Sequence, residues 1–226
     1  MKVLIFDSGP LITLSMNCLL NILPELKKNF DGKFIITKDV EKEIITKPLT
    51  IKKYELEAIR LRKLVEDKVL EFPESLGIKE SEINRFTNDY LKKANSIYSS
   101  KRDFIHIIDL GEASVLALSN ILAEKGIENM IAVDERTTRV LCERPDNLKN
   151  ILERKLHTKI KQTGEMEKKF SKIKFIRSTE LIYVAFRKGI IENQSKEMID
   201  ALLYSAKFKG ASISSDEIKE LKKLPV

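Results

Sequence analysis

The chain has 226 residues, of which 42% are hydrophobic, and it contains only 8 Gly and 6 Pro. This composition excludes a largely disordered or low-complexity protein and provides enough apolar side chains for a substantial core. The formal net charge is +7, which fits an anionic partner, although the total alone is a weak indication. The sequence shows no stretch of transmembrane length and no secretory signal at its amino terminus. We therefore expect a soluble, cytoplasmic protein that does not act at a membrane.

Short, continuously apolar runs predict the strands, because the strands of a parallel sheet are buried on both faces. In chain order these runs cover residues 2–6, 34–36, 69–72, 130–133 and 173–176. Helical patterns separate them, at residues 8–20, 37–44, 54–67, 81–97, 110–124, 135–142, 148–160, 179–188 and 195–207. The alternation predicts an α/β protein with three layers, α/β/α, around a central parallel sheet of about five strands.

Local signals set several of the predicted boundaries. Pro10 fits the first turn of a helix that Ser8 or Gly9 caps, and Pro24 is expected to end that helical region. Thr37 is expected to cap the next helix, which carries Glu43. These signals place the helix starts directly after the ends of the first two strands.

The two cysteines, Cys18 and Cys142, lie far apart and lack the spacing of metal ligands. Each has apolar neighbours, so the pattern predicts two buried, reduced thiols.

Acidic residues follow two of the predicted strands. Asp7 comes one residue after the strand at 2–6, and Asp134 comes one residue after the strand at 130–133. Ligands of parallel α/β sheets bind beyond the carboxyl ends of the strands, so neighbouring strands would aim both carboxylates into one crevice. Glu112 begins the helix at 110–124, and Glu43 lies in the helix after the second strand. Four acids from distant parts of the chain are therefore expected to converge.

Such a cluster is unfavourable by itself, because like charges at close range raise one another's pKa. A hard divalent cation removes this repulsion, and Mg²⁺ takes oxygen ligands while it keeps several waters. One or two such ions activate water and neutralise charge on the attacking and leaving oxygens of a phosphodiester. The pattern therefore favours metal-dependent hydrolysis of phosphodiester bonds.

Each acid also has a structural explanation. Asp134 fits the cap of the helix after it, and Asp109 with Glu112 fits a capping box. Glu43 has acidic neighbours and fits a solvated helix face. Asp7 is the hardest to explain in this way, because the three residues after it already supply a turn and a cap.

Several segments resemble the motifs of PIN-domain nucleases. In chain order they are residues 6–12 (FDSGPLI), 40–44 (VEKEI), 109–113 (DLGEA) and 133–139 (VDERTTR), followed by a closing helix and turn at 178–191. The similarity covers roughly residues 1–46, 105–144 and 173–222.

This resemblance implies a single PIN-like domain over residues 1–226 that acts as a Mg²⁺- or Mn²⁺-dependent endoribonuclease. It implies that Asp7, Glu112 and Asp134 bind the metal and that Glu43 is a further catalytic acid. Many members of the family are toxins of the VapC kind, which a small partner protein inhibits. RNA, an antitoxin-like small protein and a second copy of the chain are thus the implied partners.

Secondary candidates lie beside these acids. Glu135 is the second of two adjacent acids in the fourth motif, and Ser8 either holds a metal-bound water or caps a helix. Glu41 remains an alternative to Glu43, because a helix register read from one sequence is uncertain by a residue or two.

Two regions depart from the compact members of this family, a helical insertion at about 47–104 and a basic, helical one at about 145–172. Between Lys149 and Arg177, ten Lys or Arg residues face three acids, so this segment holds the entire net charge of +7. We hypothesise that it contacts the RNA backbone. A solvated helix face is the alternative explanation. The residues to test are Arg154, Lys155, Lys159 and Lys161.

A competing function is a PIN-like module that binds RNA or a protein without cutting. It predicts the same acids but no cleavage stimulated by metal. No GxGxxG or GxxxxGK[ST] loop is present, so nucleotide-cofactor and P-loop enzymes are not indicated.

Overall fold

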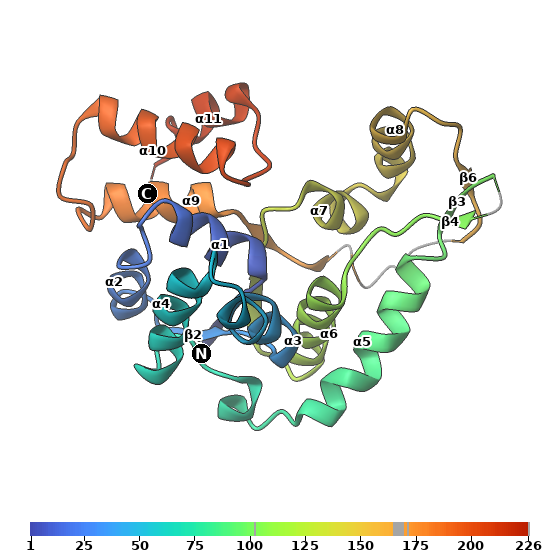
Figure 1. The fold of residues 1–226 in the computed structure, drawn as a ribbon, viewed down its shortest axis with the longest axis horizontal. Coiled ribbons are helices and arrows are strands. Elements are labelled where there is room, and N and C mark those ends of the chain that lie inside the picture. Colours follow the sequence, from blue (N-terminus) through green and yellow to red (C-terminus); the bar gives the residue numbers. More distant parts are fainter. Residues whose placement is uncertain (102, 165–169, 171, 226) are drawn as a thin grey trace.

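The computed structural model describes residues 1–101, 103–164, 170 and 172–225. In this part of the chain it shows an α/β protein with eleven α-helices, a four-stranded parallel sheet and a small antiparallel sheet, which confirms the predicted class (Figure 1). Part of the predicted basic insertion, residues 165–169 and 171, lies outside the described residues. No helix among the described residues is both long and apolar enough to cross a membrane.

The parallel sheet has the strand order β2-β1-β5-β7. Its strands are β1 (Lys2–Phe6), β2 (Gly32–Ile35), β5 (Glu128–Ala132) and β7 (Phe175–Ile176). The central strand β1 places Leu4 opposite Phe34 on one side and Met130 on the other. Asp7 continues this ladder, since its backbone N–H donates to the carbonyl of Ala132 at 2.9 Å. The carboxyl ends of β1 and β5 therefore lie side by side, which is the arrangement that a shared crevice for Asp7 and Asp134 requires.

The strand predicted at 69–72 is reduced to a single parallel bridge between Ile35 and Glu71. Within the described part of the chain the sheet thus has four strands where about five were expected. Pro73 begins a 3-10 turn, Pro73–Leu76, two residues after the bridge, and this leaves no length for a strand.

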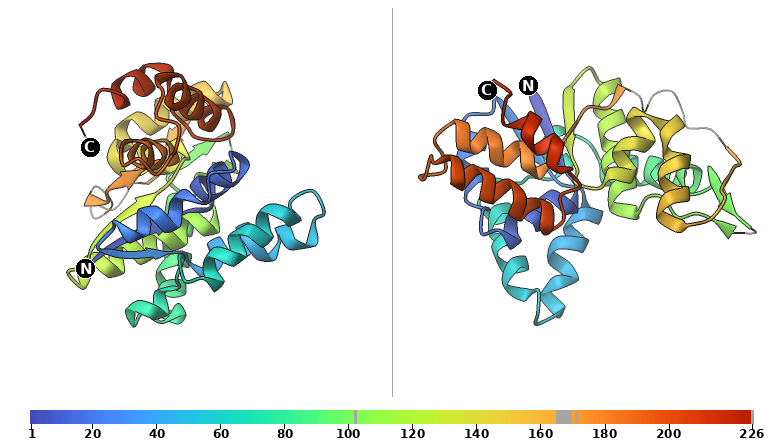
Figure 2. Two further views of the ribbon diagram at one scale, coloured as in Figure 1. Left: turned by 90° about the vertical axis from the view of Figure 1, so that its left-hand side faces the viewer. Right: turned by 90° about the horizontal axis from the view of Figure 1, so that it is seen from above.

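Most predicted helices are present within a few residues of their expected positions, and α2 and α11 were not predicted. The helices are α1 (Ser8–Met16), α2 (Ile22–Lys28), α3 (Lys38–Glu41), α4 (Glu55–Glu66), α5 (Glu80–Ala94), α6 (Leu110–Glu124), α7 (Arg136–Glu143), α8 (Pro145–Leu156), α9 (Ser178–Arg187), α10 (Lys196–Phe208) and α11 (Ser215–Leu221). In Figure 1 and the left view of Figure 2, α10 and α11 (red) lie on the outer side of α9 and α1.

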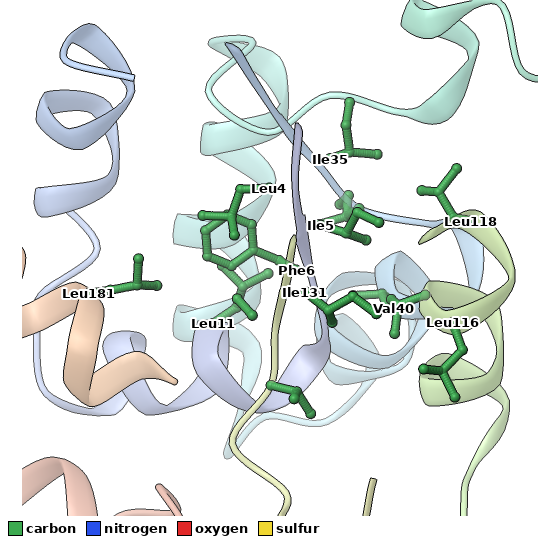
Figure 3. Packing of buried hydrophobic residues seen from close by; sticks show 14 of the residues in the cluster. Leu4, Ile5, Phe6, Leu11, Ile35, Val40, Leu116, Leu118, Ile131 and Leu181 are labelled. Atoms are coloured by element: carbon green, nitrogen blue, oxygen red, sulfur yellow. The ribbon is translucent and has the colours of Figure 1, made fainter. Parts of the chain in front are cut away.

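Helices cover both faces of the sheet, which explains the continuously apolar strands. Alternate side chains of a strand point to opposite faces. Leu4 and Phe6 point toward Leu181 of α9, whereas Ile5 points to the side of the sheet where Leu118 of α6 lies (Figure 3). Because each face has its own helical cover, β1 is buried from Val3 to Phe6.

The region after α1 differs from the prediction. The helix expected to reach residue 20 ends at Met16, where the chain turns through Cys18 with a φ of 56°. A new helix, α2, begins at Ile22 and contains Pro24 in its first turn, where the missing N–H of proline needs no partner. The turn exposes Cys18, so the expectation of two buried thiols is wrong for Cys18 and confirmed for Cys142.

The small antiparallel sheet joins the two predicted insertions, with the strand order β4-β3-β6. Its strands are β3 (Tyr98–Ser100), β4 (Asp103–Phe104) and β6 (Lys161–Gln162). Both insertions were predicted as helical, and this is only partly correct. The helix expected at 148–160 ends at Leu156, because His157 adopts a left-handed conformation with a φ of 49°. Strands of two or three residues are too short to produce a sequence pattern.

Candidate functional site

A pocket of about 430 Å³, the acidic pocket, lies beyond the carboxyl ends of β1 and β5. The predicted metal-binding and catalytic residues and secondary candidates that line it are Asp7, Ser8, Glu43, Glu112, Asp134 and Glu135. Glu41 is not part of this lining, and its carboxylate instead accepts hydrogen bonds from the hydroxyl of Thr46 at 3.0 and 3.1 Å. The geometry therefore favours Glu43 over Glu41 as the residue at the site.

Asp7 is the most perturbed acid of the pocket. It is 4% exposed, and its Oδ2 atom accepts a long hydrogen bond of 3.4 Å from the N–H of Gly9, so Asp7 itself caps α1. This corrects the expectation that Ser8 or Gly9 provides the cap. Its Oδ1 atom is buried without a hydrogen-bond partner among the described residues. Burial, followed by the charges of Glu112 and Glu43, raises the pKa of Asp7 to about 8.

Asp134 is held by groups from two helices. Its Oδ2 atom accepts hydrogen bonds of 2.8 Å from the hydroxyls of Thr13 and Ser178, and its Oδ1 atom accepts one of 2.8 Å from the N–H of Ser178. Burial raises the pKa of Asp134, and these donors oppose the effect.

Glu135 caps the following helix, because its Oε1 atom accepts from the N–H of Thr137 at 3.3 Å. Asp134 is therefore not the cap of α7.

Glu112 combines the structural role with a place in the pocket. Its Oε2 atom accepts from the N–H of Asp109 at 2.9 Å, as a capping box requires. Its Oε1 atom accepts a hydrogen bond from the hydroxyl of Thr138 on α7. Burial raises the pKa of Glu112, although the hydrogen bonds from both donors act to lower it. One carboxylate thus starts α6 and also connects this helix to α7.

Glu43 reaches the pocket from a π-helical turn, Lys42–Thr46, that continues α3. Burial raises its pKa, while hydrogen bonds from the Ser8 side chain and the Gly111 backbone lower it. A Cβ atom at Gly111 would lie 2.7 Å from Glu43 Oε1, so the carboxylate packs directly against the start of α6. The glycine of the third motif therefore leaves room for the acid of the second.

The four acids do not already form a finished metal-binding group. Among the described residues, no set of three or more Asp, Glu, His or Cys side chains is arranged around one ion position. The carboxylate oxygens of the four acids instead accept hydrogen bonds from neighbouring groups of the protein, and the buried Oδ1 of Asp7 is the exception among the described residues. Carboxylate oxygens are nevertheless the ligands that Mg²⁺ and Mn²⁺ prefer, and a buried carboxylate oxygen without a partner is stabilised by a cation. By the chemistry of their donors, the residues fit a divalent ion.

Three hydroxyl-bearing residues that hold the acids were missed by the sequence analysis: Thr13, Thr138 and Ser178. Ser178 had a usable signal, because it comes two residues after the last predicted strand, near the carboxyl end of the strand as Asp7 is for the first. Thr13 and Thr138 lie on helices, where nothing in the local pattern distinguishes a buried hydroxyl from an exposed one. His106 also lines the pocket, and its Nε2 atom lies 2.7 Å from Oδ1 of Asp109 in a hydrogen bond.

The basic candidates are divided by the fold. Lys155 lines the acidic pocket, with its Nζ atom 4.0 Å from Oε1 of Glu135. Arg154, Lys159 and Lys161 are exposed and do not line it.

Comparison with protein-family models, with curated proteins and with solved structures gives no match. The resemblance to PIN-domain nucleases therefore rests on the short motifs alone.

Proposed function

We propose that this protein is a Mg²⁺- or Mn²⁺-dependent ribonuclease that hydrolyses phosphodiester bonds at the acidic pocket. One observation carries the proposal: the carboxylate of Asp7 is buried beside other acids, and one of its oxygens has no partner among the described residues. A protein keeps such an unfavourable group when a bound cation or a reaction compensates for it. A purely structural aspartate at a helix start would not need these acidic neighbours.

The arrangement of the sheet supports a PIN-like fold as part of this proposal. All four strands are parallel, and a bridge at Glu71 adds an edge beyond β2. The acids of the first and fourth motifs, Asp7 and Asp134, follow the neighbouring strands β1 and β5. Those of the second and third, Glu43 and Glu112, enter from the helices after β2 and before β5.

In the proposed mechanism Asp7, Glu112 and Asp134 would hold the cation, which would supply activation of water and neutralisation of phosphate charge. Thr13 and Ser178 fix the orientation of Asp134, and their hydrogen bonds oppose the rise that burial causes in its pKa. These contacts resemble the outer hydrogen bonds that orient metal ligands in many proteins.

Glu43 is the fourth acid of this mechanism. Ser8 and Gly111 fix its position against the start of α6. A carboxylate held there is suited to orient a water molecule for attack or to accept its proton.

The test is cleavage of fluorescently labelled RNA, one unstructured and one hairpin, by the purified chain with Mn²⁺, with Mg²⁺ or with EDTA. Wild type is compared with Asp7→Asn and Glu112→Gln, and Asp31→Asn, at an exposed position before β2, is the matched control. We expect cleavage only with metal, a loss of about 100-fold or more in both site variants, and normal activity in the control.

Cleavage that persists equally in Asp7→Asn and Glu112→Gln would identify a contaminating nuclease and reject the proposal. RNA binding without cleavage in any metal would favour the competing function, a binding module that keeps the acids without catalysis.

A further inference from the structure

The lining of the acidic pocket is partly apolar. Four aliphatic side chains contribute to it and are termed the apolar wall: Ile105, Ile107, Leu152 and Leu156. Two come from the segment before α6 and two from α8, so the second predicted insertion contributes to the lining of the acidic pocket. Leu152 and Ile107 are buried at 4% and 6% exposure, whereas Leu156 is 45% exposed and is available to a ligand.

The same helix brings a positive charge to the pocket. Lys155 lies in the last turn of α8, beside Leu156, and its side chain is 65% exposed. Its ammonium group is 4.0 Å from Glu135, a distance at which the ion pair is weak and solvent-screened. This lysine is therefore available to an anion that enters the pocket.

The acids of the pocket, the exposed Lys155 and the apolar wall together match the parts of a nucleotide. The carboxylates with a cation suit the reacting phosphate, and the ammonium group of Lys155 suits a non-bridging phosphate oxygen. A nucleobase has two apolar faces, which an aliphatic surface covers without contacting the edges that distinguish one base from another. A ligand with a phosphate alone would leave Leu156, the exposed member of the wall, in contact with water.

We propose that the apolar wall binds the nucleobase adjacent to the scissile phosphate, with Leu156 as its exposed contact, and that Lys155 binds that phosphate. The inference rests on the proposed function and names the part of the substrate that the insertion recognises. Recognition by the wall is expected to tolerate all four bases, because the four side chains carry no hydrogen-bonding group.

The test measures binding of two small probes by calorimetry, adenosine 5′-monophosphate and ribose 5-phosphate, in the presence of Ca²⁺. Wild type is expected to bind the nucleotide about tenfold more tightly, since only this probe has a base to bury. Leu156→Ser should reduce the ratio of the two affinities, nucleotide over ribose 5-phosphate, to less than about threefold. The control Leu56→Ser, at a 55% exposed position on α4, should keep it.

Lys155 is tested in the same experiment. Lys155→Gln should weaken both probes by a similar factor, about three- to tenfold, because both carry the phosphate. Lys92→Gln, which removes an exposed lysine from the last turn of α5, controls for the effect of charge on a helix end. Thermal melts of the four variants confirm that each is folded.

Equal affinities of wild type for the two probes, no binding of either, or a full preference in Leu156→Ser would overturn the inference. RNA cleavage by the same preparations separates it from the proposed function. If cleavage depends on Asp7 but the two probes bind equally, the binding role of the apolar wall alone is rejected. If the nucleotide binds more tightly than ribose 5-phosphate but no RNA is cleaved, the ribonuclease is rejected and a nucleotide-binding site remains.

Discussion

Replacing Asp7 by asparagine should stabilise the metal-free protein while it removes activity. Asparagine has the same shape and is as good a helix cap as aspartate, so the start of α1 is preserved. The substitution removes a carboxylate that is 4% exposed and has an unpartnered oxygen beside Glu112 and Glu43. The native protein thus carries an electrostatic penalty that the variant lacks.

The magnitude follows from the pKa of Asp7, which burial and the neighbouring acids raise from 3.8 to about 8. A raised pKa means that the folded state retains a proton that the unfolded chain releases above pH 3.8. Wild-type stability is therefore complete below that pH and is lost progressively as the pH rises toward 8. At pH 7 the penalty has an upper limit of about 4 kcal/mol, and water penetration is expected to reduce it to about 1–3 kcal/mol.

The assay is thermal or urea unfolding in EDTA at pH 4 to 8, with Asp31→Asn as the matched control at an exposed position. In a chain of this size, 1 kcal/mol shifts Tm by about 2–4 °C, so Asp7→Asn should melt several degrees higher at pH 7. The gain should vanish near pH 4. Millimolar Mn²⁺ should raise the Tm of wild type but not of the variant.

A variant that is less stable than wild type at pH 7, with the same dependence on pH, would refute this reasoning. So would equal stabilisation of both proteins by Mn²⁺, because that result would place the cation away from Asp7.

Three further predictions concern other parts of the molecule. Gly111→Ala should keep stability within about 1 kcal/mol but lower RNA cleavage at least about tenfold, because the added methyl group displaces Glu43; unchanged kinetics would show that this acid is dispensable. Partial burial raises the pKa of Glu71, but two lysine ammonium groups at 2.8 and 2.9 Å outweigh it and lower the pKa to about 2. Glu71→Gln should therefore lose about 1–2 kcal/mol in urea unfolding at pH 7, and the difference should shrink as the pH falls from 4.5 toward 2. A thiol reagent should modify one cysteine of the native chain, Cys18, and reach Cys142 only after unfolding, as peptide mapping by mass spectrometry would reveal.

The sequence by itself determined the class of the fold and the order of its main elements. Runs of apolar residues on β1 and β5 indicated burial on both faces, and a continuous apolar run is a local feature of the sequence. The position of Asp7 and Asp134 directly after these strands was also visible, because the end of a strand is a local feature.

Tertiary structure alone decided which groups meet. A helix turns by about 100° per residue, so a π-helical turn of uncertain register decides between Glu41 and Glu43. The hydroxyl of Thr13 reaches Asp134 across 121 positions of the chain, and Lys155 reaches the pocket only because α8 folds back over it. Such contacts depend on the packing of whole elements, and no local pattern encodes the distance between two residues that are remote in sequence.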